Sequence, residues 1–153
     1  MSKEQWITVR VYGLLVIDGR VLVSDEVIKG KRITKFPGGG LEYGEGPKDC
    51  LIREVREEMG VQATDLEHYY TTDHFQQSHF HAQRMQVLSI YYRFQVEDIG
   101  RIATVDVPFQ GPIGTDGAEQ FRWLDLARST HDDLSLPIDR IVWRMLCGRP
   151  NTP

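Results

Sequence analysis

One segment constrains the fold of this chain more than any other: three consecutive glycines, Gly38–Gly40, precede a helix whose two ends are both marked. Pro47 suits the first position of a helix, because the N–H that proline lacks would have no intrahelical partner there. Gly60 suits the position just beyond the last turn, where the backbone often becomes left-handed. Apolar residues recur every four positions within Leu51–Met59 and predict a buried stripe. The segment therefore predicts a helix with one face packed on a core.

The same helix carries three carboxylates away from its apolar stripe. Glu54, Glu57 and Glu58 stand at positions i, i+3 and i+4, which share one helix face. The like charges of Glu54 and Glu58 should cost an isolated helix about 0.2–0.5 kcal/mol. One interpretation is a solvated acidic face, neutralised by Arg53 and Arg56. The other is a site for a hard divalent cation such as Mg²⁺, which prefers oxygen ligands.

Strands are predicted on both sides of this helix. Trp6–Ile17 and Arg20–Ser24 are rich in β-branched residues, and the Asp18-Gly19 pair between them predicts a hairpin turn. The remaining predicted strands are Arg32–Phe36, Leu66–Thr72, Met85–Val96 and Glu119–Leu124, and a second helix is predicted over Leu134–Cys147. Strands interleaved with two helices indicate an α/β fold, with a mixed sheet covered on both faces. At 153 residues, the chain is expected to form a single domain over residues 1–153.

Composition excludes several classes of protein. The net charge of −4, from 18 basic and 22 acidic residues, gives no basic footprint for duplex nucleic acid. No apolar run reaches the roughly 18 residues of a membrane helix, and the polar first ten residues are unlike a secretory signal. The two cysteines, Cys50 and Cys147, form no CxxC motif and fit a reducing compartment. A cytoplasmic protein with no membrane partner is therefore expected.

The spacing around the helix supplies the strongest signal. Gly39 is followed by Glu45 after five residues and by Arg53 after seven more, and the run REVREEMGV ends at Val61. This pattern resembles the Nudix box, GX5EX7REUXEEXGU with U aliphatic, at every specified position from Gly39 to Val61. Seven fixed residues at usage frequencies of roughly 6–7% would coincide by chance with a probability on the order of 10⁻⁸. Outside the box, Phe36-Pro37 and the later Trp123 extend the resemblance to most of the chain.

The resemblance to the Nudix family, and to its MutT-like members, implies both a fold and an activity. The implied fold is an α/β/α sandwich around a mixed β-sheet. The implied enzyme is a hydrolase of phosphorus-containing acid anhydrides: a pyrophosphohydrolase that cleaves the diphosphate of a nucleoside diphosphate derivative by water attack at phosphorus. Mg²⁺ or Mn²⁺ would clamp the phosphate oxygens and lower the pKa of the attacking water. Homodimers are common among such proteins.

Two alternative functions belong to the same family. One is a ligand-binding Nudix domain that acts as a non-catalytic nucleotide sensor, but such domains commonly have eroded boxes, whereas this box is intact. The other is isomerase chemistry on isoprenoid diphosphates, which uses a catalytic cysteine and an altered box. Neither feature is evident in this sequence.

The resemblance also implies a role for each box residue. Glu57 and Glu58 match the main metal ligands, and Glu54 matches a ligand that serves as general base in some members. Arg53 and Glu45 match an orienting pair that holds the helix against the preceding loop, a role behind the metal ligands.

Two further positions are implied in the same way. A backbone carbonyl within the glycine run, at Gly39, would complete the metal shell. Glu119 stands four residues before Trp123 and resembles a late acidic residue that supplies a further ligand or base. The alternative for Glu119 is a surface glutamate at the start of a strand.

The segment 73–84 is the other unusual part of the sequence. His79, Phe80 and His81 crowd a polar stretch, which predicts a substrate-recognition loop with a histidine on phosphate and a phenylalanine stacked on a base. The alternative is a solvated connection between strands, and no cysteine or third spaced ligand supports a zinc site. Further aromatic candidates for stacking on a base are Tyr43, Phe109 and Trp6.

Overall fold

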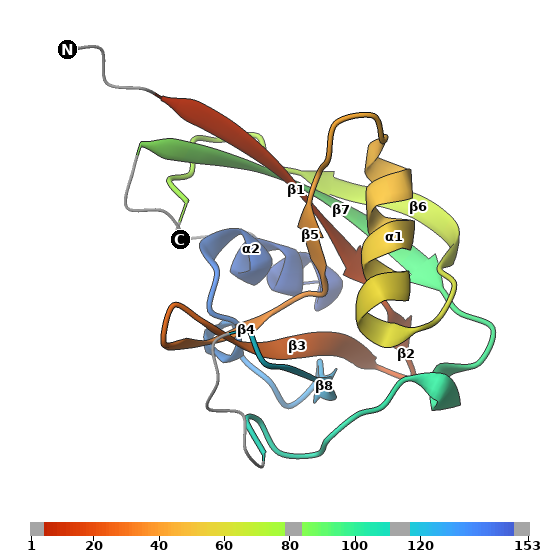
Figure 1. The fold of residues 1–153 in the computed structure, drawn as a ribbon. Coiled ribbons are helices and arrows are strands. Elements are labelled where there is room, and N and C mark those ends of the chain that lie inside the picture. Colours follow the sequence, from red (N-terminus) through yellow and green to blue (C-terminus); the bar gives the residue numbers. More distant parts are fainter. Residues whose placement is uncertain (1–4, 79–83, 111–116, 149–153) are drawn as a thin grey trace. The chain divides into compact units, whose positions relative to one another are not determined.

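The computed structural model describes residues 5–78, 84–110 and 117–148. The chain divides into two compact units (Figure 1). The first unit comprises Met1–Gly13 and Gly38–Arg101, and the second comprises Leu14–Pro37 and Ile102–Pro153. Within the described ranges, no helix has both the length and the apolar character needed to cross a membrane.

The first unit is built on a four-stranded mixed sheet. Its strands, in spatial order, are β5 (Gly38–Gly40), β1 (Trp6–Leu14), β7 (Met85–Gln95) and β6 (Thr64–Thr71). β5 runs antiparallel to β1, with Gly39 opposite Val11, and β6 runs antiparallel to β7. β1 and β7 run in the same direction (Figure 1), and the Trp6 amide donates to the Arg84 carbonyl where both begin (3.1 Å). The predicted mixed sheet is therefore confirmed.

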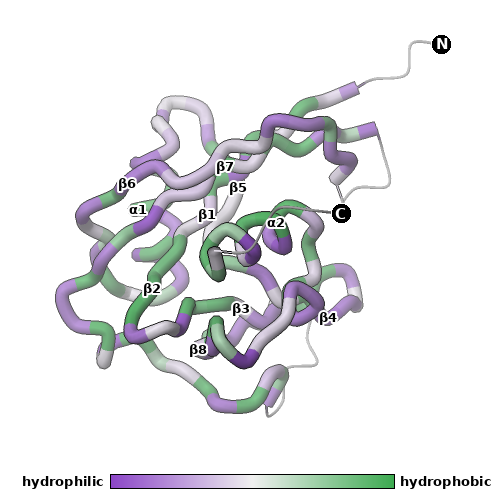
Figure 2. Tube along the Cα trace, turned by 180° about the vertical axis from the view of Figure 1, so that it is seen from behind, coloured by the Kyte–Doolittle hydropathy of each residue, from purple (hydrophilic) through white to green (hydrophobic). Residues whose placement is uncertain are grey.

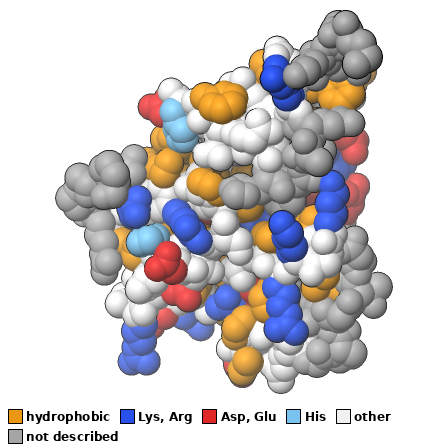
Figure 3. All heavy atoms as spheres, turned by 90° about the vertical axis from the view of Figure 1, so that its left-hand side faces the viewer, with side chains coloured by type: hydrophobic (Ala, Val, Ile, Leu, Met, Phe, Trp, Pro, Cys, Tyr) orange, Lys and Arg blue, Asp and Glu red, His pale blue; other side chains and the backbone are white. Residues whose placement is uncertain are grey.

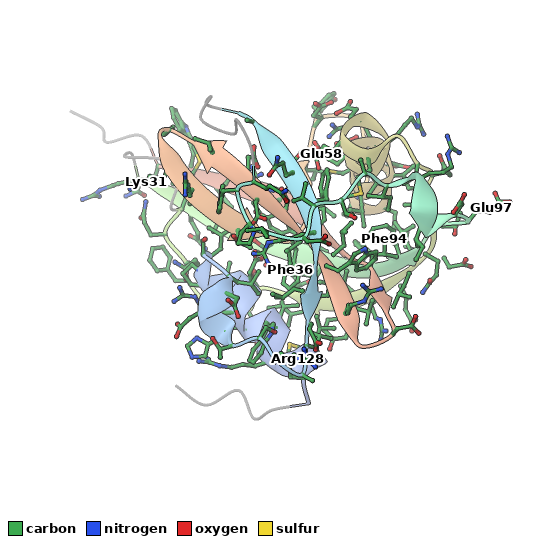
Figure 4. All side chains as sticks on the ribbon, turned by 90° about the horizontal axis from the view of Figure 1, so that it is seen from below. Lys31, Phe36, Glu58, Phe94, Glu97 and Arg128 are labelled. Atoms are coloured by element: carbon green, nitrogen blue, oxygen red, sulfur yellow. The ribbon has the colours of Figure 1, made fainter. Side chains whose placement is uncertain are left out.

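The helix of this unit, α1 (Pro47–Met59), lies alongside β5 (Figure 1). It begins at Pro47 and ends before Gly60, whose φ of 70° is left-handed, as predicted. Its buried residues are Cys50, Leu51, Val55 and Met59. A Cβ on Gly13 would lie 2.6 Å from the ring of Phe94 and 2.9 Å from the side chain of Leu51. Gly13 thus leaves room for both side chains over β1, and Figure 4 labels Phe94.

The second unit contains an antiparallel sheet centred on β3 (Arg20–Ile28). β8 (Glu119–Asp125) pairs along one edge of β3, and β2 (Val16–Ile17) and β4 (Lys31–Lys35) pair along the other. The middle of β3 is hydrophobic (Figure 2), and Val21, Leu22 and Val23 are fully buried. Asp18 and Gly19 both have positive φ, 53° and 74°, as a two-residue hairpin turn requires. This confirms the predicted hairpin.

A second helix, α2 (Pro137–Leu146), belongs to the same unit. The Phe36 amide donates to the buried carboxylate of Asp139 (3.1 Å), which ties α2 to the end of β4. The helix begins at Pro137 and not at the predicted Leu134, because proline occupies its first turn and the preceding His131–Asp133 forms a separate 3₁₀ turn, η2. Another 3₁₀ turn of three residues, η1 (Ile99–Arg101), follows β7 in the first unit.

Two further sequence predictions are corrected. The strand predicted over Trp6–Ile17 is interrupted at Leu15, whose carbonyl accepts a hydrogen bond from the Leu22 amide (3.0 Å). Its two parts, β1 and β2, consequently join different sheets. The Gly38–Gly40 run, for which no strand was predicted, is a short edge strand paired with β1.

Candidate active site

The glycine strand and helix α1 meet at Gly39 and Glu54. A Cβ on Gly39 would overlap the Glu54 carboxylate, so the missing side chain makes room for that carboxylate against the strand backbone. Glu54 is consequently well covered, with 14% of its side chain exposed. The Glu54 carboxylate thus lies against the Gly39 backbone, and carboxylate oxygen is a ligand that Mg²⁺ accepts.

Arg53 joins the helix to the segment that leads into it. Its Nε and one Nη donate to the two carboxylate oxygens of Glu45, at 3.0 and 2.7 Å, in a bidentate pair. The same Nη donates to the Gly40 carbonyl (3.2 Å). Glu45 in turn accepts from the Glu42 amide (2.9 Å). One guanidinium therefore holds β5, the following loop and α1 together.

The other Nη of Arg53 faces the acidic side of the helix. It donates to Glu54 at 2.9 Å and to Glu57 at 3.3 Å. The hydrogen bonds from Arg53 hold the pKa of Glu45 at about 2, below its ordinary 4.5, and the same bonds raise the pKa of Arg53. Glu45 and Arg53 are therefore both charged across the neutral pH range.

The three glutamates of α1 differ in exposure. Glu57 is 58% exposed, whereas Oε2 of Glu58, which Figure 4 labels on α1, is buried. Among the residues that the structure describes, no three His, Cys, Asp or Glu side chains stand close enough to hold a metal ion. The helix face carries carboxylates of the kind that suits Mg²⁺, but the hydrogen bonds from Arg53 hold Glu54 and Glu57 against the guanidinium.

Cys50 lies beside this network without taking part in acid–base chemistry. It is fully buried, and its Sγ lies 3.5 Å from the Gly40 carbonyl. Burial raises the pKa of the Cys50 thiol to about 12. A thiol held protonated in this way is a poor nucleophile.

Glu119 is the first residue of β8 in the second unit. Its Oε2 accepts a hydrogen bond from Oγ of Ser24 at 2.5 Å, and Ser24 is fully buried. Nearby, the ammonium of buried Lys35 lies 3.5 Å from Glu26. The sequence analysis did not predict Ser24 as the partner of Glu119. The signal was available, because Ser24-Asp25-Glu26 interrupts the otherwise apolar β3.

The predicted substrate-binding residues have different outcomes. Tyr43 is fully exposed in the loop between β5 and α1. His79, Phe80 and His81 lie outside the described residues.

The family model described as NUDIX domain matches residues 6–142. Among solved structures, the chain is similar to a MutT NUDIX hydrolase from Burkholderia pseudomallei, with 23% identity and a TM-score of 0.65 over 92% of this chain and 98% of that one. It is also similar to a MutT protein from Bacillus halodurans, with 16% identity and a TM-score of 0.65 over 91% and 82% of the two chains.

A NUDIX hydrolase from Nitrosomonas europaea gives 18% identity and a TM-score of 0.61, over 93% of this chain and 90% of that one. At these identities the structural likeness shows the fold, and it confirms the predicted α/β class. The family match covers most of the chain and both of its units. The chain therefore belongs to the Nudix family and is a hydrolase that acts on phosphorus-containing acid anhydrides.

Proposed function

We propose that this chain is a metal-dependent pyrophosphohydrolase that cleaves the diphosphate linkage of a nucleoside diphosphate derivative, with Mg²⁺ or Mn²⁺ as cofactor. The observation that carries the proposal is the contact of the Glu54 carboxylate with the Gly39 backbone, where a Cβ would overlap it. Such a contact holds a carboxylate against the backbone of the edge strand, and a cation bound by that carboxylate would also bind the oxygens of a phosphate.

The helix supplies the ligands in this proposal. Glu57 and Glu58 would hold the metal together with Glu54 and a backbone oxygen near Gly39. When bound, the metal neutralises the diphosphate and lowers the pKa of the attacking water. Arg53 keeps the glutamates in place, because it already contacts Glu54 and Glu57.

The proton of the attacking water needs an acceptor among the chain's carboxylates. Glu54 and Glu119 are the two candidates, and both are held by donors: Glu54 by Arg53, and Glu119 by Ser24. These hydrogen bonds orient each carboxylate, and the lone pairs that they leave free are the ones that could accept the proton.

The proposal also covers the domain organisation, the oligomeric state and the location of the protein. We take residues 1–153 as a single Nudix domain that acts on a small molecule, and homodimers are compatible with that role. Cys50 and Cys147 are both free thiols, which supports a reducing cytoplasm as the location.

The test is hydrolysis of NDP-sugars, dinucleotides, oxidised dNTPs and ADP-ribose with Mg²⁺, with Mn²⁺ and with EDTA. We expect turnover only with a divalent cation. Glu57→Gln should lower kcat by at least about 100-fold, the usual loss for one transition-state group. Glu97→Gln removes an exposed carboxylate from a turn outside α1 and should leave kcat unchanged.

A thermal melt separates loss of chemistry from loss of fold. Without metal, Glu57→Gln should be as stable as the parent or slightly more so, because it removes one of the charges that crowd α1. Mg²⁺ should raise the Tm of the parent by mass action, and that of the variant much less. Turnover that survives exhaustive EDTA treatment contradicts the proposal, and nucleotide binding without turnover would favour a sensor.

A further inference from the structure

Three large hydrophobic side chains are exposed together in the first unit, around the point where strands β1 and β7 begin. Their exposed fractions are 46% for Trp6, 68% for Ile7 and 68% for Phe75. Tyr43 and Val107 are the other exposed large hydrophobic residues of the described ranges, and neither belongs to this group. Figure 3 views the side on which β1 and β7 begin, and hydrophobic side chains are exposed there. Clustered apolar exposure of this kind marks a surface that another molecule covers.

The three side chains line a pocket of about 470 Å³. Its other lining residues are Gln5, Gln77, Arg84 and Gln86. Backbone pairing holds the walls of the pocket together: the Trp6 amide donates to the Arg84 carbonyl (3.1 Å), and Gln77 forms an antiparallel β-bridge with Gln86. The backbone of this surface is therefore already ordered, and a partner that covers it removes little further conformational freedom.

The lining has the composition of a protein interface. Trp, Phe and Arg are enriched in the cores of interfaces, and Lys, Asp and Glu are depleted there. Trp6, Phe75 and Arg84 supply the enriched types, and none of the described lining residues is Lys, Asp or Glu, in a chain with 22 acidic residues. A lipid surface fits less well, because segments that lie on membranes are rich in Lys and Arg, whereas this lining has one basic residue.

The polar part of the lining can pair with a copy of itself. About a two-fold axis, a surface meets the same surface of its partner, so a cluster of like charges would repel its copy. Gln5, Gln77 and Gln86 carry amides, which both donate and accept hydrogen bonds and can therefore pair with one another. The single guanidinium of Arg84 can stack on an aromatic ring of the facing copy. The lining is thus complementary to itself, and a second copy of this chain is the occupant that it fits.

The beginning of β1 favours the same occupant. Pairing with β5 covers Arg10–Tyr12, so Trp6 and Ile7 begin the strand outside that ladder. The segment 6–9 contains neither a charged residue nor a proline. Charges and proline are the usual means by which an exposed strand avoids pairing with another chain, and their absence here leaves this part of β1 suited to an interface.

We propose that this surface is the interface of a homodimer, in which two copies of the chain meet through Trp6, Ile7 and Phe75 about a two-fold axis. The inference goes beyond the proposed function, with which a dimer is only compatible, because it names the surface that pairs. The three hydrophobic side chains form the apolar centre of the interface, and the amides and Arg84 form its polar rim.

Sedimentation velocity over a series of protein concentrations tests the interface, and far-UV circular dichroism checks that each variant is folded. The parent should form a dimer. Ile7→Glu places like charges in the interface and should raise the Kd of the dimer at least about 30-fold, as loss of a central interface side chain does. Val107→Glu makes the same kind of change at an exposed apolar residue (57% exposed) of the second unit and should leave the Kd unchanged. Equal weakening by the two variants overturns the inference.

A mixture of Ile7→Glu with Ile7→Lys tests the two-fold arrangement. Position 7 of one copy lies near position 7 of the other in such a dimer, so opposite charges should restore association that each variant lacks alone. The mixed dimer should be at least about tenfold tighter than either variant with itself, and a mixture that stays monomeric overturns the inference. Sedimentation needs neither substrate nor metal. A parent that is monomeric throughout the series, including one that floats with vesicles of anionic lipid, therefore overturns the inference and leaves the proposed function standing.

Discussion

At the scale of single residues, a Cβ added to each of the three glycines of β5 would contact a different neighbour. A Cβ on Gly38 would overlap the Val11 backbone, and its φ of 150° strains any side chain further. A Cβ on Gly39 would overlap the Glu54 carboxylate instead. A Cβ on Gly40 would have only the tip of Arg10 nearby, at 3.9 Å. Backbone cannot move aside, whereas a carboxylate can, so the three positions should respond differently to alanine.

The three alanine variants therefore separate fold from function. Gly38→Ala should destabilise the fold by roughly 1–3 kcal/mol, the cost of overpacking. Gly39→Ala should fold but displace Glu54, with kcat about 10–100-fold lower, the range for residues that position metal ligands. Gly40→Ala should stay within about 0.5 kcal/mol of the parent, as surface changes do. Urea unfolding measures the stability of the three variants, and steady-state kinetics measure their kcat. An unchanged kcat in Gly39→Ala would show that the Glu54 contact plays no part in the mechanism.

At the scale of elements, a buried ion pair joins β3 to β8. Asp25 is fully buried and accepts two hydrogen bonds from Arg122, at 2.6 and 3.2 Å. Thr34 of β4 donates a third, at 2.6 Å. The three strands of the second unit are thus connected through one carboxylate in the interior of their sheet. Removing the guanidinium would leave that charge without its cation.

Loss of the Arg122 guanidinium should destabilise the fold. Arg122→Met should lower the free energy of unfolding by about 3–5 kcal/mol, because a buried charge is left uncompensated. Arg128→Met is the matched control, since Arg128 is 89% exposed and 3.8 Å from Asp125, and Figure 4 shows it labelled in the second unit. An exposed pair of this kind contributes about 0–1 kcal/mol. Similar urea midpoints for the two variants would contradict the role of the buried pair.

At the scale of the whole molecule, acid stability depends on the contact between Glu45 and Arg53. The pKa of Glu45 is about 2 in the fold and 4.5 ordinarily. Because the unfolded chain takes up this proton at a higher pH than the fold does, the contribution is complete above pH 4.5 and is lost as pH falls toward about 2. Acidification therefore weakens the fold through this residue.

The pH profile of stability tests this linkage. Glu45→Gln should be less stable than the parent near neutral pH, and its free energy of unfolding should fall less steeply between pH 4.5 and about 2. Glu97→Gln, a change at an exposed position, should keep the slope of the parent. Urea unfolding at a series of pH values gives both slopes, and equal slopes for Glu45→Gln and the parent would refute the assignment.

Much of the fold could be predicted, because its elements carry local signals. The helix from Pro47 to Gly60 was predicted with both ends, since proline and glycine act on the backbone at their own positions. The Asp18-Gly19 turn was predicted for the same reason. The break at Leu15 was not, because Leu15 has the composition of a strand residue and only its hydrogen bond to Leu22 reveals the division.

The sequence by itself determined the family, because the Nudix box is a matter of spacing along one continuous segment from Gly39 to Val61. It also determined which side chains share the acidic face of α1, since helix geometry places residues three and four apart together. Site roles inferred from that spacing stay predictions until the variants are measured.

Only the tertiary structure decided which distant segments meet. The hydrogen bond from Ser24 to Glu119 spans 95 positions along the chain, and a pocket of the first unit is lined by Trp6, Phe75 and Arg84. Such contacts depend on strand order and register, which arise from the burial of many side chains at once and leave no pattern in any short stretch of sequence. Local chemistry therefore follows from the order of the residues, whereas contacts between distant segments follow from the way the strands pair.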